Sequence, residues 1–321
     1  MTDHANLVLD IRGLHHVYPP DVRVLHDLNI QIARGQIVGL VGPSGCGKST
    51  LLRSILGTHT PTKGEVVMMR RGPDGGAVSS VVRAPGRDRG IVYQRYALFP
   101  HLTAVDNVAI GLMFDETNVL DRTLGFMGWR KLKAQHRARA AAMLERVGLG
   151  DALDKYPQEL SGGMRQRVAI AQALVMEPEV LLLDEPFGAL DEATREELQE
   201  MLLGFYHENQ DAARRGDPPP YTILIVTHEL NEAIYVGDRV LGLSQYWDWK
   251  AAGFDASPGA TIVYDKPAPI YALDQAKDYN MFRAQREEVR RVVFENDGSL
   301  DPAEHVVFWR DASDHGVAGQ R

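Results

Sequence analysis

The sequence contains little cysteine and no long apolar run. Cys46 is the single cysteine among 321 residues, which excludes an intrachain disulfide and a metal cluster built from several cysteines. No apolar stretch approaches the ~18–20 residues that a membrane-spanning helix needs, and the first residues lack the basic and apolar regions of a signal peptide. The sequence therefore predicts a chain that does not cross a membrane by itself.

An excess of positive charge is also missing. The chain has 35 lysines and arginines against 43 aspartates and glutamates, a net charge of -8, which gives no general reason to bind nucleic acid. Hydrophobic residues make up 44% and charged residues 24%, as in ordinary globular proteins. The length suits about two domains of ~150 residues each, so a globular protein without a nucleic-acid partner is expected.

Short apolar stretches alternate with longer helical patterns along the chain. Strands are expected at residues 7–11, ending at Gly13, and at 25–32, 36–41, 64–69, 91–93, 180–183 and 223–226. Helices are expected at residues 49–56, 105–113, 130–147, 164–176 and 192–208. This alternation predicts an α/β fold with a mainly parallel sheet, and the strand-free stretch from 95 to about 150 predicts an inserted helical subdomain.

Two loops and the last part of the chain carry weaker signals. Residues 71–89 are rich in glycine, proline and arginine and predict a hairpin or a surface loop. Residues 211–220 are polar and contain prolines, which predicts a further loop. After residue 253 we expect a strand at 261–264 and a charged amphipathic helix at 278–293, but this tail matches no motif.

The strongest motif follows the strand expected at 36–41 and precedes the helix expected at 49–56. It matches the phosphate-loop pattern G-x-x-x-x-G-K-[ST]. Its glycines let backbone N–H groups surround one anion, and the following helix adds the positive end of its dipole. Lys48 is expected to reach the terminal phosphates, and Ser49 to ligate Mg²⁺. The residues expected to bind nucleotide here are Gly42, Pro43, Ser44, Gly45, Cys46, Gly47, Lys48, Ser49 and Thr50.

Polar side chains end two further apolar strands. Asp184 and Glu185 follow residues 180–183, and beside a phosphate loop they predict an Mg²⁺ ligand acting through water and a group that orients or deprotonates the hydrolytic water. Taken alone, this pair also fits a solvated turn. His228 follows the strand expected at 223–226, at the sheet edge where ligands gather in open α/β folds, and is expected to contact the γ-phosphate.

A second helix start offers another place for an anion. Ser161, Gly162 and Gly163 supply a hydroxyl and two small residues before the helix expected at 164–176, which suits phosphate binding by a helix N-terminus. By local chemistry alone, a simple helix cap by Ser161 is the stronger reading.

These motifs together closely resemble the nucleotide-binding subunit of ABC transporters, over about residues 7–243. The resemblance implies a P-loop NTPase core with an inserted helical subdomain and an N-terminal antiparallel β portion. It implies that ATP and Mg²⁺ are the cofactors. It also assigns residue roles: adenine stacking to Tyr18, catalysis to Glu185, His228 and Gln94, metal binding to Ser49, Gln94 and Asp184, nucleotide contacts by the signature motif to Ser161, Gly162 and Gly163, and a D-loop contact to Asp191.

The resemblance further implies how such a subunit works. Two similar ATPase subunits pair head to tail, so that residues 161–163 of one close over the γ-phosphate held by Lys48 of the other. Opening and closing then drive separate transmembrane permease subunits, with residues 95–107 near a coupling helix. The sequences around 161–167 and 184–191 look like bacterial import cassettes of the nitrate, sulfonate and taurine group, which implies an extracytoplasmic solute-binding protein and a peripheral place on the cytoplasmic face of the inner membrane. An exporter subunit and a soluble, non-transport ABC ATPase remain alternatives.

The domain division expected from this resemblance places the nucleotide-binding core at 1–94 and 162–250, the helical subdomain at 95–161 and an extension without assigned role at 251–321. Residues 71–89 and 115–133 look longer than in a minimal cassette. Phe126, Met127 and Trp129 there belong either to the subdomain core or to a contact with a membrane partner. Met164 stands where glutamine is commoner in the signature motif.

Cys46 has two readings. At the start of a helix the pKa of a thiol is often lowered, and a thiol reagent would then block ATP binding. Alternatively Cys46 is only a small, inert residue of the loop.

Overall fold

The computed structural model describes residues 6–71, 77–95, 97–115, 126–188, 190–268, 279–295 and 300–306. They form two compact units, the first made of Met1–Gly86 with Leu202–Arg321 and the second of Arg87–Met201. Helix α6 (Glu192–Arg214) carries the chain from the second unit back to the first. Within the described residues, no helix combines the length and the apolar character needed to cross a bilayer. The predicted assignment to a core, a helical subdomain and an extension stays a prediction.

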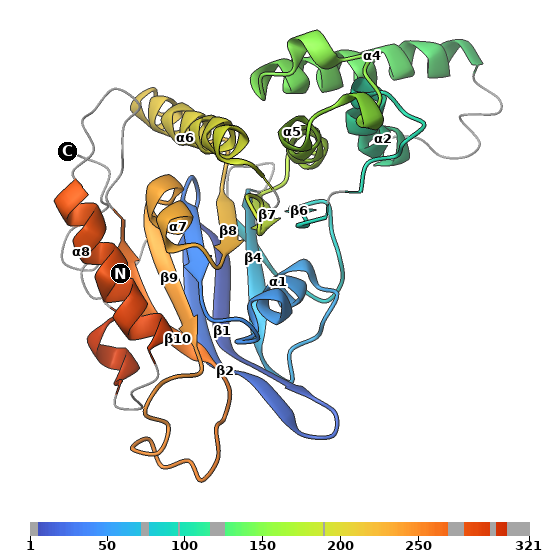
Figure 1. Cartoon of the computed structure of the whole chain (residues 1–321). Coiled ribbons are helices and arrows are strands. Elements are labelled where there is room, and N and C mark those ends of the chain that lie inside the picture. The colour runs from blue at the N-terminus through green and yellow to red at the C-terminus, as the bar shows by residue number, and fades with distance from the viewer. Residues whose placement is uncertain are drawn as a thin grey trace. The chain divides into compact units, whose positions relative to one another are not determined.

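An antiparallel sheet forms one part of the first unit (Figure 1). Its strand order is β2-β1-β4-β5, with β1 at Leu7–Tyr18, β2 at Val22–Ala33, β4 at Lys63–Arg71 and β5 at Ala77–Val81. The pairing of β5 with β4 makes the predicted hairpin. The expected end of the first strand at Gly13 is wrong, because this glycine adopts a φ of 52° in a bulge between Ile11 and Leu14. A bulge kinks a strand without ending it.

The second sheet of the first unit is mixed, with the strand order β10-β9-β3-β8. Strands β3 (Ile37–Val41), β8 (Ile223–Thr227) and β9 (Arg239–Ser244) are parallel, and β10 (Thr261–Pro267) runs antiparallel to β9. All five residues of β3 are buried, as expected of a parallel strand covered on both faces. Helices α1 (Lys48–Leu56) and α7 (Leu230–Val236) follow β3 and β8. The predicted α/β class with a parallel core and an N-terminal antiparallel part is confirmed.

Among its described residues, the second unit contains a parallel strand pair, the first part of α6 and three further helices. Strand β6 (Arg89–Val92) pairs in parallel with β7 (Val180–Asp184). The three further helices lie where helical patterns were expected, with short 3₁₀ turns at Gly150–Ala152 and Pro157–Glu159 before the last of them. They are α2 (Ala104–Asp115), α4 (Phe126–Arg146) and α5 (Gly162–Leu174).

Some sequence expectations for the second unit lie outside the described residues. Most of the long stretch at 115–133 does so, as do the side chains of Phe126, Met127 and Trp129. Their two readings, core or partner contact, therefore stay open.

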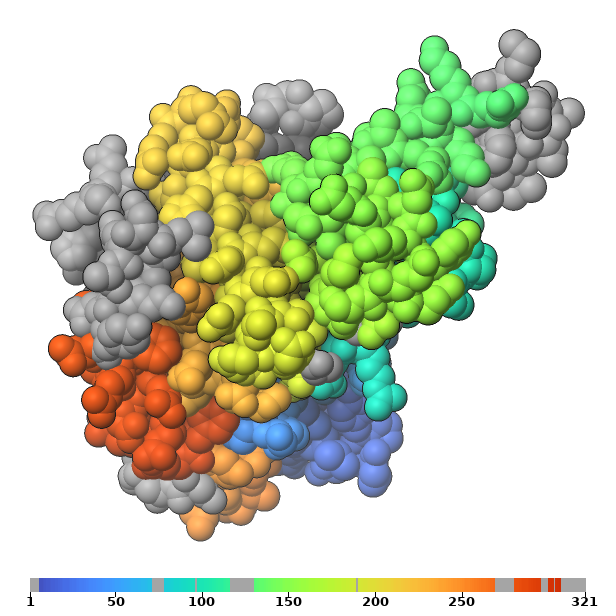
Figure 2. Space-filling view, turned by 45° about the horizontal axis from the view of Figure 1, so that its top comes forward, coloured from blue at the N-terminus to red at the C-terminus, as the bar shows by residue number. Residues whose placement is uncertain are grey.

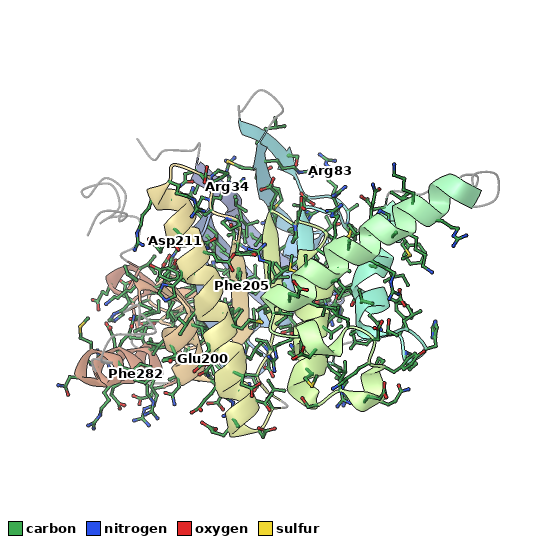
Figure 3. All side chains as sticks on the ribbon, turned by 90° about the horizontal axis from the view of Figure 1, so that it is seen from above. Arg34, Arg83, Glu200, Phe205, Asp211 and Phe282 are labelled. Atoms are coloured by element: carbon green, nitrogen blue, oxygen red, sulfur yellow. The ribbon has the colours of Figure 1, made fainter. Side chains whose placement is uncertain are left out.

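Helix α6 extends beyond its expected end at residue 208 to Arg214. Asn209 is 2% exposed, and its side chain bonds the carbonyls of Gly35 and Tyr221 and the N–H of Tyr221. The ring of Phe205 also packs on Tyr221. Figure 3 shows Phe205 on this helix, with Glu200 and Asp211 before and after it. These contacts hold the end of α6 in a helix, although the sequence from residue 211 onwards is typical of a loop.

The tail after residue 253 belongs to the packed core of the first unit. It contains β10, helix α8 (Tyr279–Val289), a π turn at Arg290–Phe294 and a 3₁₀ turn at Pro302–Glu304. Its buried ion pair joins Arg239 to Asp265, each with a side chain 1% exposed, and Arg239 also donates 2.6 Å to the carbonyl of Gln31. Strands β9, β10 and β2 are thereby tied together. In Figure 2 the exposed side of α8 appears in red.

Candidate nucleotide-binding site

The phosphate loop lies between β3 and α1, as the sequence predicts. Gly45 and Gly47 have φ of 80° and 101°, a conformation that glycine adopts readily. A Cβ on Gly47 would lie 2.6 Å from Leu25 of β2, which leaves no room for a side chain. Helix α1 begins without a side-chain cap, so its first N–H groups suit an incoming anion.

Lys48 lies across this loop. Its side chain is 8% exposed, and its Nζ donates to the carbonyl oxygens of Gly42 at 2.7 Å and Pro43 at 3.0 Å. The ammonium group is therefore held at the loop by short backbone contacts. Ser44, Gly45 and Ser49 are exposed. A buried cation beside accessible hydroxyls and uncapped N–H groups fits a nucleotide phosphate with Mg²⁺.

Cys46 does not have the character expected of a reactive thiol. Its side chain is 1% exposed, and a Cβ on Gly42 would lie 2.8 Å from its sulfur. Burial raises the pKa of the Cys46 thiol and outweighs the opposing effect of the Lys48 charge. The expectation of a lowered thiol pKa is therefore wrong.

Tyr18 reaches the helix that follows the phosphate loop. Its hydroxyl lies 3.2 Å from Oγ1 of Thr50, and its ring makes edge contacts with His16 and His59. These neighbours hold the ring next to α1, in agreement with a place beside a bound nucleotide. The two histidines were not singled out from the sequence, although His16 lies two residues before Tyr18 and hence on the same face of β1.

His228 emerges beside the phosphate loop. Val41, the last residue of β3, pairs with Thr227, the last residue of the parallel strand β8. The loop at Gly42 and the side chain of His228 therefore leave the same sheet edge. His228 is about half exposed, with its Nε2 3.5 Å from Oε1 of Glu229. Strand topology thus brings these two motifs together, as the sequence predicts.

A second pair of predicted catalytic residues meets in the second unit. Gln94 follows β6 and Glu185 follows β7, and because these strands are parallel neighbours their ends share one edge. Nε2 of Gln94 donates 3.2 Å to Oε2 of Glu185. Glu185 has a φ of 49°, a strained value for a non-glycine residue that is often found at functional sites. Asp184, the last residue of β7, is half-buried.

The signature residues begin helix α5. Ser161 caps it by accepting 3.2 Å from the N–H of Met164, and the phosphate contact expected of residues 161–163 stays a prediction. A Cβ on Gly163 would lie 1.8 Å from Cγ2 of Thr194. Asp191 accepts hydrogen bonds from the N–H and the hydroxyl of Thr194, which lower the pKa of its carboxyl group. Gly163 is therefore packed against Thr194, and Asp191 is held by hydrogen bonds from the same residue. Ser161 is held by its bond at the start of α5.

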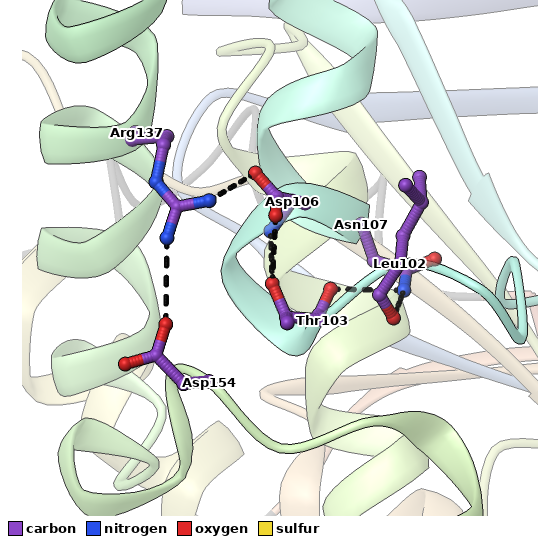
Figure 4. Close-up of polar contacts among 6 residues, drawn as sticks. All are labelled: Leu102, Thr103, Asp106, Asn107, Arg137 and Asp154. Atoms are coloured by element: carbon purple, nitrogen blue, oxygen red, sulfur yellow. Dashed lines mark hydrogen bonds and ion pairs between the residues drawn. The ribbon is translucent and has the colours of Figure 1, made fainter.

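The segment between Gln94 and α2 is also fixed by side chains (Figure 4). Asn107 is fully buried and makes four hydrogen bonds, which join its side chain to the backbone of Phe99, Leu102 and Thr103. Asp106 exchanges hydrogen bonds with Thr103 at the start of α2 and binds Arg137 of α4. Asn107 was not among the residues expected from the sequence, and a polar residue within an apolar helix is the signal that could have found it.

The predicted site residues therefore form two sets. Tyr18, Thr50, the phosphate loop and His228 lie in the first unit, whereas Gln94, Asp184, Glu185, Asp191 and residues 161–163 lie in the second. Among the described residues, no cluster of three or more His, Cys, Asp or Glu side chains forms a ready metal site.

Comparisons with known proteins agree with this geometry. Residues 25–188 match the family model described as ABC transporter. The bicarbonate transport ATP-binding protein CmpD of Synechocystis is 41% identical over 236 residues, covering 73% of each chain. The nitrate import ATP-binding protein NrtD of Synechococcus elongatus is 36% identical, covering 81% of this chain and 82% of that protein.

Solved structures give the same result. A dimeric ATP-binding cassette bound to ADP and phosphate, in a post-hydrolysis state, superposes with a TM-score of 0.57 and 26% identity, covering 82% of this chain and all of that one. The cbiO1 protein of Clostridium perfringens, part of an ABC transporter complex, also has a TM-score of 0.57 and 26% identity, covering 74% of this chain and 84% of that one. This chain therefore belongs to the ABC transporter family, as one of its ATP-binding and ATP-hydrolysing subunits.

Proposed function

We propose that this chain powers a multi-subunit importer of a small solute, by ATP-driven head-to-tail pairing of two such subunits. The observation that supports the proposal is the shared edge of β3 and β8, from which the loop that carries Lys48 and the side chain of His228 both leave. The relatives support import, since they are named as bicarbonate transport, nitrate import and sulfate or thiosulfate import proteins. Nitrate, sulfonate, taurine and small nitrogen compounds are the cargo classes proposed from the sequence.

In the proposed mechanism the first unit binds the nucleotide. The uncapped start of α1 and Lys48 hold the phosphates, Tyr18 stacks on the adenine, and Ser49 ligates Mg²⁺. His228 contacts the γ-phosphate from the end of β8. Mg²⁺ neutralises phosphate charge when it is bound, with Gln94 and Asp184 as its further ligands.

The second unit supplies the hydrolytic groups and the closing surface. Glu185 orients the attacking water and accepts its proton, and Gln94, already bonded to Glu185 at 3.2 Å, holds that carboxylate in place. Ser161, Gly162 and Gly163 close over the γ-phosphate bound by the partner subunit, and Asp191 lines the contact between the two copies. The dimeric form of a solved relative supports this pairing.

The remaining partners follow from the same proposal. Residues 95–107 dock on a transmembrane permease at the cytoplasmic face of the inner membrane, and an extracytoplasmic solute-binding protein delivers the cargo. An exporter subunit or a soluble ABC ATPase remains the alternative. Co-purification with a permease, followed by ATPase measurements in vesicles with nitrate, sulfate, bicarbonate or taurine, separates these readings, and no stimulation by any external solute would argue against import.

The catalytic assignment is tested by Glu185→Gln. The substitution removes the proton acceptor, so kcat should fall by about 10²- to 10⁴-fold while ATP binding is retained. Phosphate release measures kcat, equilibrium titration measures ATP affinity, and light scattering with ATP and Mg²⁺ should reveal a trapped dimer.

Glu200→Gln is the matched control, because Glu200 is an exposed carboxylate on α6 outside the proposed site. Its kcat should equal that of the wild type. If Glu185→Gln hydrolyses ATP as fast as this control, Glu185 is not the base.

A further inference from the structure

The hydroxyl group of Thr227 makes two hydrogen bonds next to His228. It donates 2.7 Å to Oε2 of Glu232 and accepts 3.0 Å from the N–H of Glu229. Thr227 is 1% exposed and Glu232 is 4% exposed, so the bond between them is buried, whereas the bond from Glu229 is partly buried. His228 therefore stands between two residues whose positions depend on one buried hydroxyl group.

Glu232 in turn belongs to a helix that packs on the strand before the phosphate loop. The next residue of α7, Ala233, is fully buried against Gly39 of β3. A Cβ on Gly39 would lie 2.8 Å from both the side chain and the carbonyl oxygen of Ala233, so the helix approaches this strand as closely as a glycine permits. Strand β3 continues directly into the loop at Gly42.

A continuous chain of contacts thus connects the phosphate loop with His228. It runs from β3 through Gly39 and Ala233 to Glu232, and from Glu232 through the Thr227 hydroxyl to the turn that carries His228. Backbone pairing at Val41 and Thr227 fixes where this turn begins, but the direction it takes afterwards depends on the hydroxyl bonds.

We propose that Thr227 and Glu232 are positioning residues for His228, which hold it at the γ-phosphate bound by the phosphate loop. This inference rests on the role of His228 in the proposed function. Neither residue needs to touch the nucleotide. Their pairing sets the turn at 227–229, and because a displacement of ~1 Å at a catalytic group can reduce a rate by ~10²-fold, its loss should affect turnover more than ATP binding.

The test separates positioning from stability. Thr227→Val removes the hydroxyl that donates to the buried Glu232 carboxylate, which destabilises the protein. Replacing both partners, as in Thr227→Val with Glu232→Leu, removes the buried carboxylate together with its Thr227 donor and is expected to fold, since removing both members of a buried pair is often nearly neutral. Both variants should lower kcat by about 10- to 100-fold, with little change in KM for ATP. Thr227→Ser keeps the hydroxyl and should restore kcat.

Thr222→Val provides a matched control. Thr222 is also buried, at 4% exposed, and lies just before the other end of β8, where its hydroxyl accepts 3.1 Å from the N–H of Gly35. The same chemical change there should cost similar stability and leave kcat unchanged. A loss of kcat in this control equal to that of Thr227→Val would overturn the positioning role.

A double-mutant cycle with His228→Ala tests whether Thr227 acts on kcat through His228. Residues that act through one another are non-additive, so Thr227→Val should cause no further loss of kcat once His228 is absent. Wild-type kcat in the double variant Thr227→Val with Glu232→Leu, or a full additional loss in the His228→Ala background, would refute the inference. If His228→Ala itself leaves kcat unchanged, the proposed role of His228 fails, and the inference fails with it.

Discussion

Two helices of this chain begin at residues expected to bind phosphate, and they begin in opposite ways. Helix α1 starts after Gly47 with no side-chain cap, whereas helix α5 starts at Ser161, whose hydroxyl already bonds the N–H of Met164. At the start of α1 no side chain accepts a hydrogen bond from the first N–H groups, whereas at the start of α5 the hydroxyl of Ser161 accepts one. A phosphate can enter the first without displacing a side chain, but at the second it must replace or share the serine bond.

This difference fits an order of events. In the proposed mechanism the nucleotide would bind first at α1, where Lys48 is already held by two carbonyl oxygens. The signature helix of a partner subunit would close afterwards, and until then its cap would keep it stable without a ligand. An open helix end thus suits tight binding, and a self-capped end suits a reversible contact.

Among the changes at the two helix starts, the largest effect is expected from Lys48→Ala, which removes the cation expected to bind phosphate at the start of α1. The side chain supplies charge-assisted hydrogen bonds to phosphate, each worth ~1.5–3 kcal/mol, so the Kd for ATP should rise by about 10- to 100-fold or more. Calorimetric titration measures it. Lys63→Ala, an exposed lysine of β4, should bind ATP like the wild type, and equal affinities for the two variants would contradict the comparison.

A smaller effect is expected at the self-capped end from Gly163→Ala. The new Cβ would lie 1.8 Å from Cγ2 of Thr194, and such overpacking costs ~1–3 kcal/mol of unfolding free energy. Thr194→Ser removes the clashing methyl group and should recover much of this loss. Urea unfolding measures both.

Gly204→Ala in α6 is the control for Gly163→Ala, and it is expected to change the free energy of unfolding in the opposite direction. No atom lies within 4 Å of its added Cβ, and alanine is favoured over glycine inside a helix by ~0.5–1 kcal/mol. The Gly204 variant should therefore be more stable than the wild type. A Gly163→Ala variant as stable as the wild type would show that α5 is not tightly fixed on Thr194.

The smallest effect concerns Cys46 at the open end. Because burial raises the pKa of its thiol, the reactive thiolate fraction is low near neutral pH and grows only as the pH rises above the ordinary thiol range. Alkylation by iodoacetamide, followed by mass spectrometry, should be slow at pH 8 and much faster for the same chain in urea. Equal rates in the two states would show that the thiol is accessible.

The local parts of the structure could be predicted from the sequence. The phosphate loop, its flanking strand and helix, and the polar residues at the ends of β7 and β8 follow from residue type and short spacing. The meeting of His228 with this loop could also be predicted, because parallel strands end at a common edge. The cap at Ser161 required only the residue type at a helix start.

The remainder depends on contacts between distant residues. The end of α6 depends on Asn209, which bonds Gly35 and Tyr221, and no local pattern contains that information. The bond between Thr227 and Glu232 likewise depends on how closely α7 approaches Gly39. Of the two readings of Cys46, the lowered thiol pKa fails for the same reason, since sequence spacing shows the helix start but not the burial of the thiol.

The buried pair of Arg239 and Asp265 has a consequence for synthesis of the chain. Arg239 is made 26 residues before its carboxylate partner, and a buried charge whose partner is missing costs ~3–5 kcal/mol. A nascent chain that has exposed β9 but not yet β10 at the ribosome cannot complete this sheet favourably. Because β3, which leads into the phosphate loop, pairs with β9, we expect the loop to reach its final setting only after the tail strand has been translated.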